Sequence, residues 1–173
     1  NSPADVEALK ALSVGNITLG EKITETTGKI GEKIDITALE VMEGEAVVPY
    51  IHSNGKLGVM VVLKNVNGAE VEEAGKDVAM QIAAMNPVAV DKDGVDPTVI
   101  EKEIEIGKEQ ARQEGKPEQI IEKIAQGKLQ KFFKENTLLS QSFVKDSSQS
   151  IQQYLDGVSK GLTVTEFKRV AIG

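Results

Sequence analysis

The sequence predicts an α+β protein in which helices cover a small antiparallel sheet and an antiparallel helical coiled-coil hairpin is inserted into the chain. Residues 33–65 alternate apolar and polar side chains as β-strands do, and the flanking segments repeat apolar side chains every three or four residues as helices do. Two highly charged helical stretches, 96–114 and 115–133, follow one another and are joined by the Gly-Lys-Pro with which the second begins. Residues 161–172 return to alternation and would complete the sheet.

The first 33 residues are predicted to be helical. Ser2 can cap a helix whose first position is Pro3, which has the backbone angle that this position needs. A Gly-Asn pair at 15–16 ends this helix. Apolar side chains at helical spacing then predict a second helix that ends near Gly31, namely Leu19, Ile23 and Ile30.

Three β-type runs follow, and we expect them to form an antiparallel three-stranded meander. The first run consists of alternating Ile34, Ile36 and Ala38. A Glu-Gly-Glu turn at 43–45 leads to the second run, and Ser53-Asn54-Gly55 connects the second run to the third. Asn-Gly between β-rich runs is a strong hairpin signal, because both residues accept positive φ.

A helix over 69–86 is expected to cover one face of this sheet. Its apolar side chains recur in steps of three and four and are Val71, Gly75, Val78, Ile82 and Met85. Asn86-Pro87 ends it. Further on, residues 148–157 predict a short helix. The last strand is predicted from Leu162, Val164 and Phe167.

Each helix of the charged hairpin has an apolar row, and the row on the first helix is narrow, which is typical of a coiled-coil seam. The row on the first helix is Ile100, Ile104, Gly107 and Ala111. The row on the second helix is Ile121, Ile124, Ala125, Leu129 and Phe132. Two such rows facing each other would leave the charges in solvent. The alternative is a hairpin folded back on the body of the protein.

Composition narrows the possible functions. The net charge of −7 and an aromatic content of 3% without Trp argue against direct nucleic-acid binding, which needs Lys and Arg against phosphates. The absence of Cys excludes disulfides and thiolate sites and fits a reducing cytoplasm. No apolar run approaches the ~18 residues of a membrane span, so we expect no membrane contact. The chain begins with Asn rather than Met, which we interpret as a processed chain or a piece of a longer one.

Groups for catalysis are scarce. The single His52 lies beside a predicted turn, where it is either a solvated side chain or, less simply, a general base. The segment 91–96 resembles a calcium loop but has Asp96 where Gly is needed, and Asp96 followed by Pro97 suits a helix start better. The segment 27–33 lacks the second glycine of a phosphate loop. We therefore expect a protein-binding chain that is not an enzyme and holds no cofactor or metal.

Longer segments carry a resemblance to a known family. They are "KIGEKIDI" (29–36), "VMEGEAVVPYIHSNGKLGVMVVL" (41–63), "VAMQIAAMNP" (78–87), "IEKEIEIGKEQARQEGKPEQIIEKIAQGKLQKFF" (100–133) and "LLSQSFVKD" (138–146). In order and spacing they resemble bacterial translation elongation factor Ts. The resemblance implies that family's dimerisation-type α+β domain with a projecting coiled-coil hairpin. It also implies binding to the GTPase elongation factor Tu in its GDP form and acceleration of GDP release.

The resemblance further implies which residues contact the partner. They are Ile30 and Gly31 at a helix end, His52 at a hairpin tip, and Phe143 and Val144 in a loop. Ile30 and Phe143 also have a simpler interpretation as core residues. A homodimer is compatible with the family's fold.

Two family features do not occur in this sequence: the N-terminal ubiquitin-associated-like helical domain and a Thr-Asp-Phe-Val motif whose Phe disturbs the GTPase's nucleotide site. We therefore expect mainly a docking half. We divide the chain into a helical segment at 1–33, an α+β subdomain at 34–96 and 134–173, and the hairpin at 97–133. The alternatives are a coiled-coil adaptor or scaffold unrelated to translation and, less simply, a carboxylate-metal hydrolase.

Overall fold

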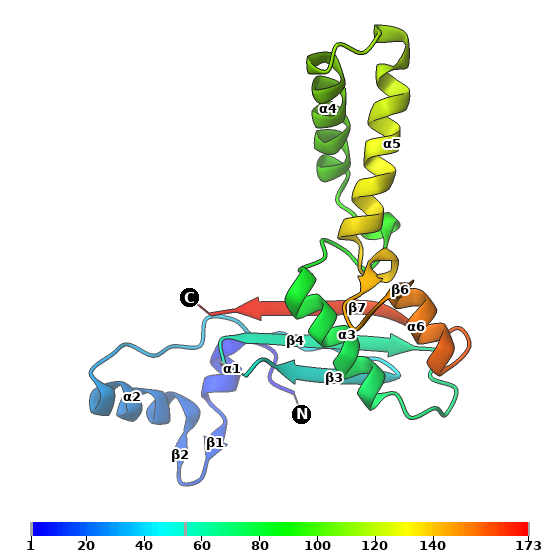
Figure 1. Cartoon of the computed structure of the whole chain (residues 1–173). Helices are drawn as coiled ribbons and strands as arrows, with labels where there is room; N and C mark the ends of the chain where they lie inside the picture. Colours follow the sequence, from blue (N-terminus) through cyan, green and yellow to red (C-terminus); the bar gives the residue numbers. More distant parts are fainter. Residues whose placement is uncertain (1, 54, 173) are drawn as a thin grey trace. The chain divides into compact units, whose positions relative to one another are not determined.

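The structure, a computed structural model, describes residues 2–53 and 55–172 (Figure 1). It divides into two compact units, Asn1–Met42 and Glu43–Gly173. Residues 34–42 therefore group with the preceding helices.

The first unit contains two helices joined by a small hairpin. Its elements are α1 (Val6–Lys10), β1 (Ser13–Val14), β2 (Ile17–Thr18) and α2 (Leu19–Ile30). The predicted start of α1 at Ser2 and Pro3 is wrong, because Asp5 caps the helix and accepts a hydrogen bond of 2.7 Å from the Ala8 amide. The end of α2 is confirmed, since its C-cap is Gly31, with φ of 77°. None of the described side chains of residues 2–42 is fully buried.

The predicted strand at 34–38 is wrong. Residues 33–43, all described, form neither helix nor strand. Alternation produces a strand only where a neighbouring strand pairs with it and one face is buried, and Ile34 is 38% exposed. The expected meander is therefore a two-stranded hairpin that gains its third strand from a distant part of the chain.

The sheet of the second unit has the order β3-β4-β7, with both pairs antiparallel. Its strands are β3 (Ala46–Ile51), β4 (Leu57–Lys64) and β7 (Thr163–Ala171). The β3–β4 hairpin is confirmed by pairs such as Val48↔Val61, although Asn54 of its turn lies outside the described residues. The final strand is also confirmed, and β4 lies at the centre of the sheet.

A β-bulge in β7 explains the uneven spacing of its apolar residues. Val164 pairs with Leu63 and Glu166 with Val62, so that Thr165 is an extra residue in the ladder. One extra residue reverses the alternation of faces. As a result, Val164 and Phe167, which are three positions apart, both pack on the core.

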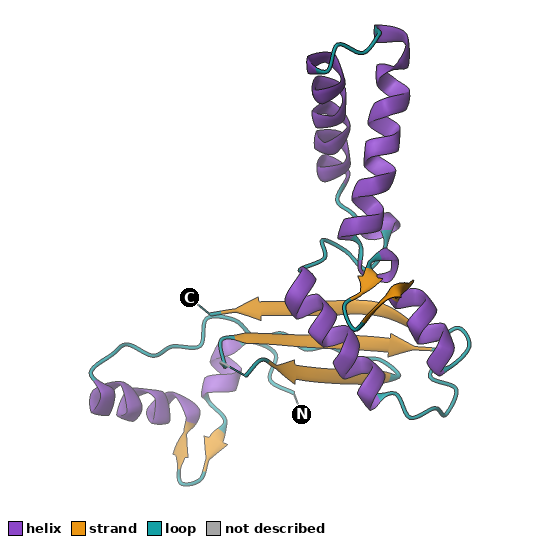
Figure 2. Cartoon of the chain, viewed as in Figure 1, coloured by secondary structure: helices purple, strands orange, loops and turns teal. Residues whose placement is uncertain are grey.

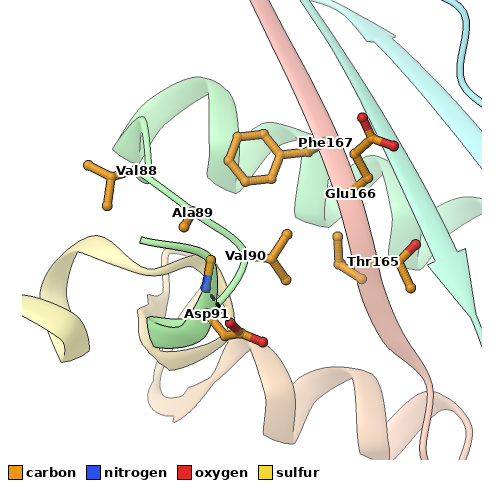
Figure 3. Close-up of a pocket in the computed structure, with 9 residues that line it drawn as sticks. Val88, Ala89, Val90, Asp91, Thr165, Glu166 and Phe167 are labelled. Carbon is orange, nitrogen blue, oxygen red and sulfur yellow. Dashed lines mark hydrogen bonds between the residues drawn. The ribbon is translucent and has the colours of Figure 1, made fainter. Parts of the chain in front are cut away.

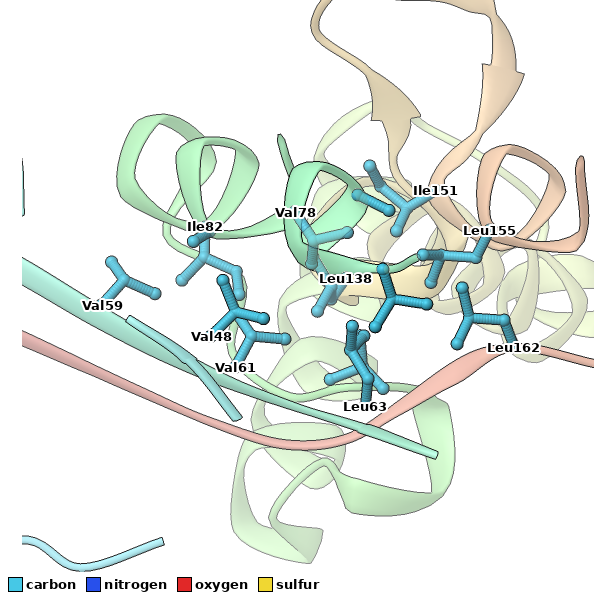
Figure 4. Close-up of a cluster of buried hydrophobic side chains, with 14 of the residues drawn as sticks. Val48, Val59, Val61, Leu63, Val78, Ile82, Leu138, Ile151, Leu155 and Leu162 are labelled. Carbon is cyan, nitrogen blue, oxygen red and sulfur yellow. The ribbon is translucent and has the colours of Figure 1, made fainter. Parts of the chain in front are cut away.

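One face of the sheet is covered by α3 (Glu72–Met85) together with α6 (Ile151–Val158) (Figures 1 and 2). The predicted end of α3 is confirmed, because Asn86 is left-handed with φ of 45°. Side chains from the sheet, both helices and the segment after the hairpin form one core (Figure 4). Its fully enclosed members include Val61, Leu63, Val78, Ile82, Leu138, Ile151, Leu155 and Leu162.

Two long helices, α4 (Pro97–Gln113) and α5 (Glu118–Asn136), pack against each other and extend away from the sheet (Figure 1). The helical hairpin is thus present as predicted, and it is not folded back on the body. Its buried residues are Gly107, Ala111, Ile121, Ala125 and Leu129. Asp96 caps α4 through the Thr98 amide at 2.8 Å, which confirms the helix start over the calcium loop. Coiled-coil geometry of the pair remains a prediction.

The two ends of the hairpin lie side by side at its root. The Val88 amide donates to Asn136 O at 2.9 Å, and the Leu138 amide donates to Ala89 O at 3.0 Å. The short elements around the root are η1 (Lys92–Gly94), η2 (Leu138–Ser140), β5 (Ser142–Phe143) and β6 (Asp146–Ser150) (Figure 2). These main-chain bonds join the entry and exit of the hairpin in a parallel arrangement.

Candidate partner-binding surface

The residues predicted to contact a partner occupy three places. Ile30 and Gly31 lie in the first unit, at the end of α2. His52 follows β3, and the segment 142–145, here called the β5 loop, follows the hairpin; both belong to the second unit.

The end of α2 presents an apolar side chain to solvent. Ile30 is 57% exposed, so the interpretation as a core cap does not hold for it. The Gly31 amide closes the last turn on Thr27 O at 2.9 Å. A Cβ at Gly31 would meet nothing within 4 Å, but its positive φ of 77° favours glycine. The end of α2 thus carries an exposed apolar side chain beside a left-handed glycine.

His52 is an exposed turn side chain, as the sequence predicted. Its amide donates to Leu57 O at 2.8 Å, which closes the β3–β4 turn. Its Nδ1 lies 2.9 Å from the phenol oxygen of Tyr50. When that phenol donates to Nδ1, the imidazole carries its proton on Nε2, which remains free to donate to another group.

The two predicted residues of the β5 loop point in different directions. Phe143 is only 4% exposed, and its ring stacks on Tyr154 at a centroid distance of 4.4 Å. Phe143 therefore lies in the core, as its simpler interpretation predicted, whereas the other four residues are exposed. Val144, the next residue, is 49% exposed. The buried ring anchors the loop and the exposed side chain projects from it.

Sequence reasoning missed Gln81, which holds the β5 loop from the side of α3. Its side chain is fully buried. Its Nε2 donates to Gln141 Oε1 and to Ser142 O, both at 3.1 Å, and its Oε1 accepts from the Val144 amide at 2.8 Å. The available signal was a glutamine inside the apolar run "VAMQIAAM", since a buried amide needs hydrogen-bond partners.

Asp77, one turn earlier on α3, holds the same loop from another side. It is 7% exposed, and its carboxylate accepts from Lys145 Nζ at 2.6 Å and from the Tyr154 hydroxyl at 3.0 Å. Burial and, secondarily, the hydrogen bond to Asp77 raise the pKa of Tyr154 to about 12. Phenol, carboxylate and ammonium therefore form a connected polar cluster beneath the loop.

A cavity of about 540 Å³ lies between residues 88–94 and β7 (Figure 3). Of its acidic side chains, Asp91 is engaged in capping η1, where it accepts from the amides of Asp93 and Gly94 at 2.9 and 3.1 Å. Across residues 2–53 and 55–172 there is no group of three or more His, Cys, Asp or Glu side chains arranged to hold a metal ion. No helix in those ranges is long and apolar enough to span a membrane.

Comparison with known proteins supplies the deciding observation. The sequence matches the family Elongation factor TS over residues 1–173. The chain belongs to the elongation factor Ts family. The resemblance inferred from the sequence is thereby confirmed, and the alternative of an adaptor unrelated to translation loses its support.

Curated elongation factor Ts proteins are similar to this chain at high identity. The protein of Cytophaga hutchinsonii is 63% identical over 171 residues, covering 98% of this chain and 62% of its own length. The protein of Amoebophilus asiaticus is 55% identical over 171 residues, which cover 99% of this chain and 62% of its own length. That of Christiangramia forsetii is 51% identical over 174 residues, covering 100% and 62%. The chain thus spans about three fifths of the length of the elongation factor Ts relatives it matches.

Proposed function

We propose that this chain is part of a guanine nucleotide exchange factor that binds elongation factor Tu·GDP and promotes release of GDP during translation elongation. The observation that carries the proposal is the match to the elongation factor Ts family along the whole chain. The chain itself breaks no covalent bond in this proposal, needs no cofactor, and acts in the cytoplasm, where translation takes place.

Exchange follows from thermodynamic linkage. A protein that binds the nucleotide-free GTPase more tightly than the GDP form must weaken GDP binding by the same factor. A surface that binds both forms equally shifts nothing, however tight the complex. Contacts that are equally strong in both forms of the GTPase therefore only dock the factor. Release of GDP needs a further contact that distorts the nucleotide site.

Four exposed residues suit the docking role. Ile30 and Val144 offer apolar side chains, His52 offers a ring nitrogen, and Gly31 fixes a helix end. Each lies at a defined turn or helix end, so little ordering is needed on binding. Phe143 supports Val144 from within the core.

The Thr-Asp-Phe-Val motif implied by the family resemblance does not occur in this sequence. We therefore expect the chain to bind elongation factor Tu·GDP but to accelerate GDP release only weakly. Stopped-flow release of a fluorescent GDP analogue, with this chain and with a full-length relative, tests this expectation. Release as fast as with the full-length factor would place the exchange machinery within this chain, and no binding at all would refute the docking role.

His52→Ala gives a sharper test of the surface. The imidazole is exposed and supports no core, so we expect weaker binding with an unchanged melting temperature. Calorimetric titration measures the affinity, and thermal unfolding measures the melting temperature. Thr37→Ala, at another exposed residue that is not one of the proposed contact residues, is the control.

A homodimer of dimerisation-domain type is also proposed, with no direct nucleic-acid or membrane contact. Ile51 and Val170 both pair with Gly58 in the sheet and are 68% and 53% exposed. Light scattering at increasing concentration tests the dimer, and Ile51→Lys should shift the mass toward the monomer.

A further inference from the structure

The hairpin and the β5 loop meet at one buried side chain. Gln81 on α3 bonds to Gln141, which follows the hairpin, and to the main chain of the β5 loop. We propose that Gln81 is a positioning residue that locks the helical hairpin and the β5 loop to α3 as a single rigid body. The use of that body to dock a GTPase rests on the function proposed above; the lock itself does not.

The link to the hairpin passes through a second buried amide. Gln141 is 2% exposed, and its Oε1 accepts from Gln81. Its Nε2 donates to Glu135 O at 3.0 Å. Glu135 lies in the last turn of α5, where a helix leaves its carbonyls without partners in the helix. The two amides therefore connect α3 to the C-terminal end of α5.

The link to the β5 loop is made by the same Gln81 side chain. Ser142 O accepts from its Nε2, and the Val144 amide donates to its Oε1. Phe143, between these two residues, is held by its stacked ring. The exposed side chain of Val144 therefore projects from a backbone whose hydrogen bonds are fixed on both sides.

Burial makes this arrangement selective. Gln81 is 0% exposed, so a change in hairpin direction or loop position would leave its amide, or the groups it contacts, without partners and without water. An apolar side chain of similar volume would pack there with no such constraint. The buried amide thus favours one arrangement of the hairpin and the β5 loop over other arrangements close to it.

Asp77 provides an internal comparison. It holds the β5 loop through Lys145 and contacts Tyr154, and neither of these partners lies in the hairpin. Loss of the Asp77–Lys145 ion pair should loosen only the end of the loop. Loss of the Gln81 amide should loosen both the loop and the hairpin.

Distance measurements between spin labels test the lock directly. The chain has no Cys, so Gln119→Cys near the hairpin tip and Glu166→Cys on β7 give two unique labelling sites. Pulsed electron resonance on the full chain should give a single narrow distance distribution. Gln81→Met and Gln141→Met should each broaden or split it, and Asp77→Asn should leave it narrow.

Hydrogen exchange at the Val144 amide distinguishes the link from Gln81 to the β5 loop from the link through Gln141 to the hairpin. Gln81→Met should abolish its protection, whereas Gln141→Met should preserve it, because the Gln81 acceptor remains. If the spin-label distance distributions of Gln81→Met and Gln141→Met are both as narrow as that of the unsubstituted chain, the proposed lock is overturned. Because Gln141→Met leaves Gln81 in place, it decides the question even if Gln81→Met does not fold.

Measuring the affinity of the variants for elongation factor Tu is a separate experiment, which tests whether the locked body is used for docking. If Gln81→Met binds elongation factor Tu more weakly, and Asp77→Asn loses less affinity than Gln81→Met does, the result supports the use of the locked body for docking. A chain with the locked hairpin that binds no elongation factor Tu overturns the proposed function and supports the lock alone.

Discussion

Tyr154 reports on the packing beneath the β5 loop. Its ring stacks on Phe143, and its hydroxyl donates to Asp77 at 3.0 Å. Burial, followed by the bond to Asp77, raises its pKa to about 12 from the ordinary 10.0. The phenol therefore keeps its proton in the folded chain at pH values where it would lose it in the unfolded chain.

This raised pKa predicts a loss of stability in strong base. The contribution of the protonated phenol is fully present below about pH 10 and is lost as the pH rises toward about 12. Urea unfolding across this range should show a steeper fall for the unsubstituted chain than for Tyr154→Phe. Parallel curves would contradict the assignment. Absorbance titration of Tyr50→Phe, which leaves Tyr154 as the remaining tyrosine, measures the pKa itself.

At the residue scale, exposed positions were easier to predict than buried polar ones. The turn position of His52 followed from the hairpin signal beside it. Asp77 and Gln81 could not be assigned partners, because Lys145 and Val144 lie more than 60 positions further along the chain. Only the fold brings these groups together, and periodicity within α3 contains no information about them. The part played by the exposed residues in binding stays a prediction.

The helix α3 approaches the sheet at a glycine. A Cβ on Gly75 would lie 2.4 Å from Cγ2 and 2.8 Å from Cβ of Val48. Val48 is β-branched and buried in β3, so it cannot turn aside at low cost. The helix can lie this close to the strand only because position 75 has no side chain.

Gly75→Ala should therefore destabilise the chain by about 1–3 kcal/mol, the usual cost of overpacking. Gly127→Ala is the matched control, because its Cβ would meet nothing within 4 Å in α5. That change should stabilise the chain by about 0.5–1 kcal/mol, since alanine favours a helix over glycine. Urea unfolding measures both. Equal effects in the two variants would argue against close packing at Gly75.

Deletion of 98–133 with a short Gly-Ser linker should leave the sheet folded. The two ends of the hairpin are already joined by main-chain bonds between 88–90 and 136–139, so little backbone must move. None of the buried residues of α4 and α5 belongs to the core cluster against the sheet. Amide exchange in β4 is the measurement. Rapid exchange there would show that the hairpin supports the sheet.

The elements that were predicted correctly carry long, regular patterns or strong end signals. The hairpin helices, α3 and β7 belong to this group. The strand expected at 34–38 failed because alternation does not reveal whether a pairing strand exists. The pairs β1–β2 and β5–β6 were missed because the strands β1, β2 and β5 have only two residues, too few for a period.

At the scale of the whole molecule, burial is unevenly distributed. The described side chains of 2–42 include none that is fully buried, whereas the second unit contains a continuous core. Units of about 40 residues rarely fold stably without additional support. Local opening is easiest where few apolar groups are buried.

Amides of α2 should therefore exchange well before those of α3 and β4. Brief proteolysis should cut within the first unit and leave a resistant fragment that contains residues 43–172. Exchange followed by mass spectrometry distinguishes the units, with the denatured chain as a reference. Equal protection in α2 and β4 would mean that the first unit is as stable as the second.

The central strand β4 has neighbours from very different parts of the chain. β3 precedes it directly, whereas β7 follows roughly a hundred residues later. On a translating ribosome, the β3–β4 hairpin and α3 therefore emerge before β7, and one edge of β4 remains unpaired for roughly 5–20 s of synthesis. An open strand edge is a template for pairing with other chains. Nascent chains of this protein should consequently be most prone to aggregation, and most in need of chaperones, during the interval in which the helical hairpin is being made.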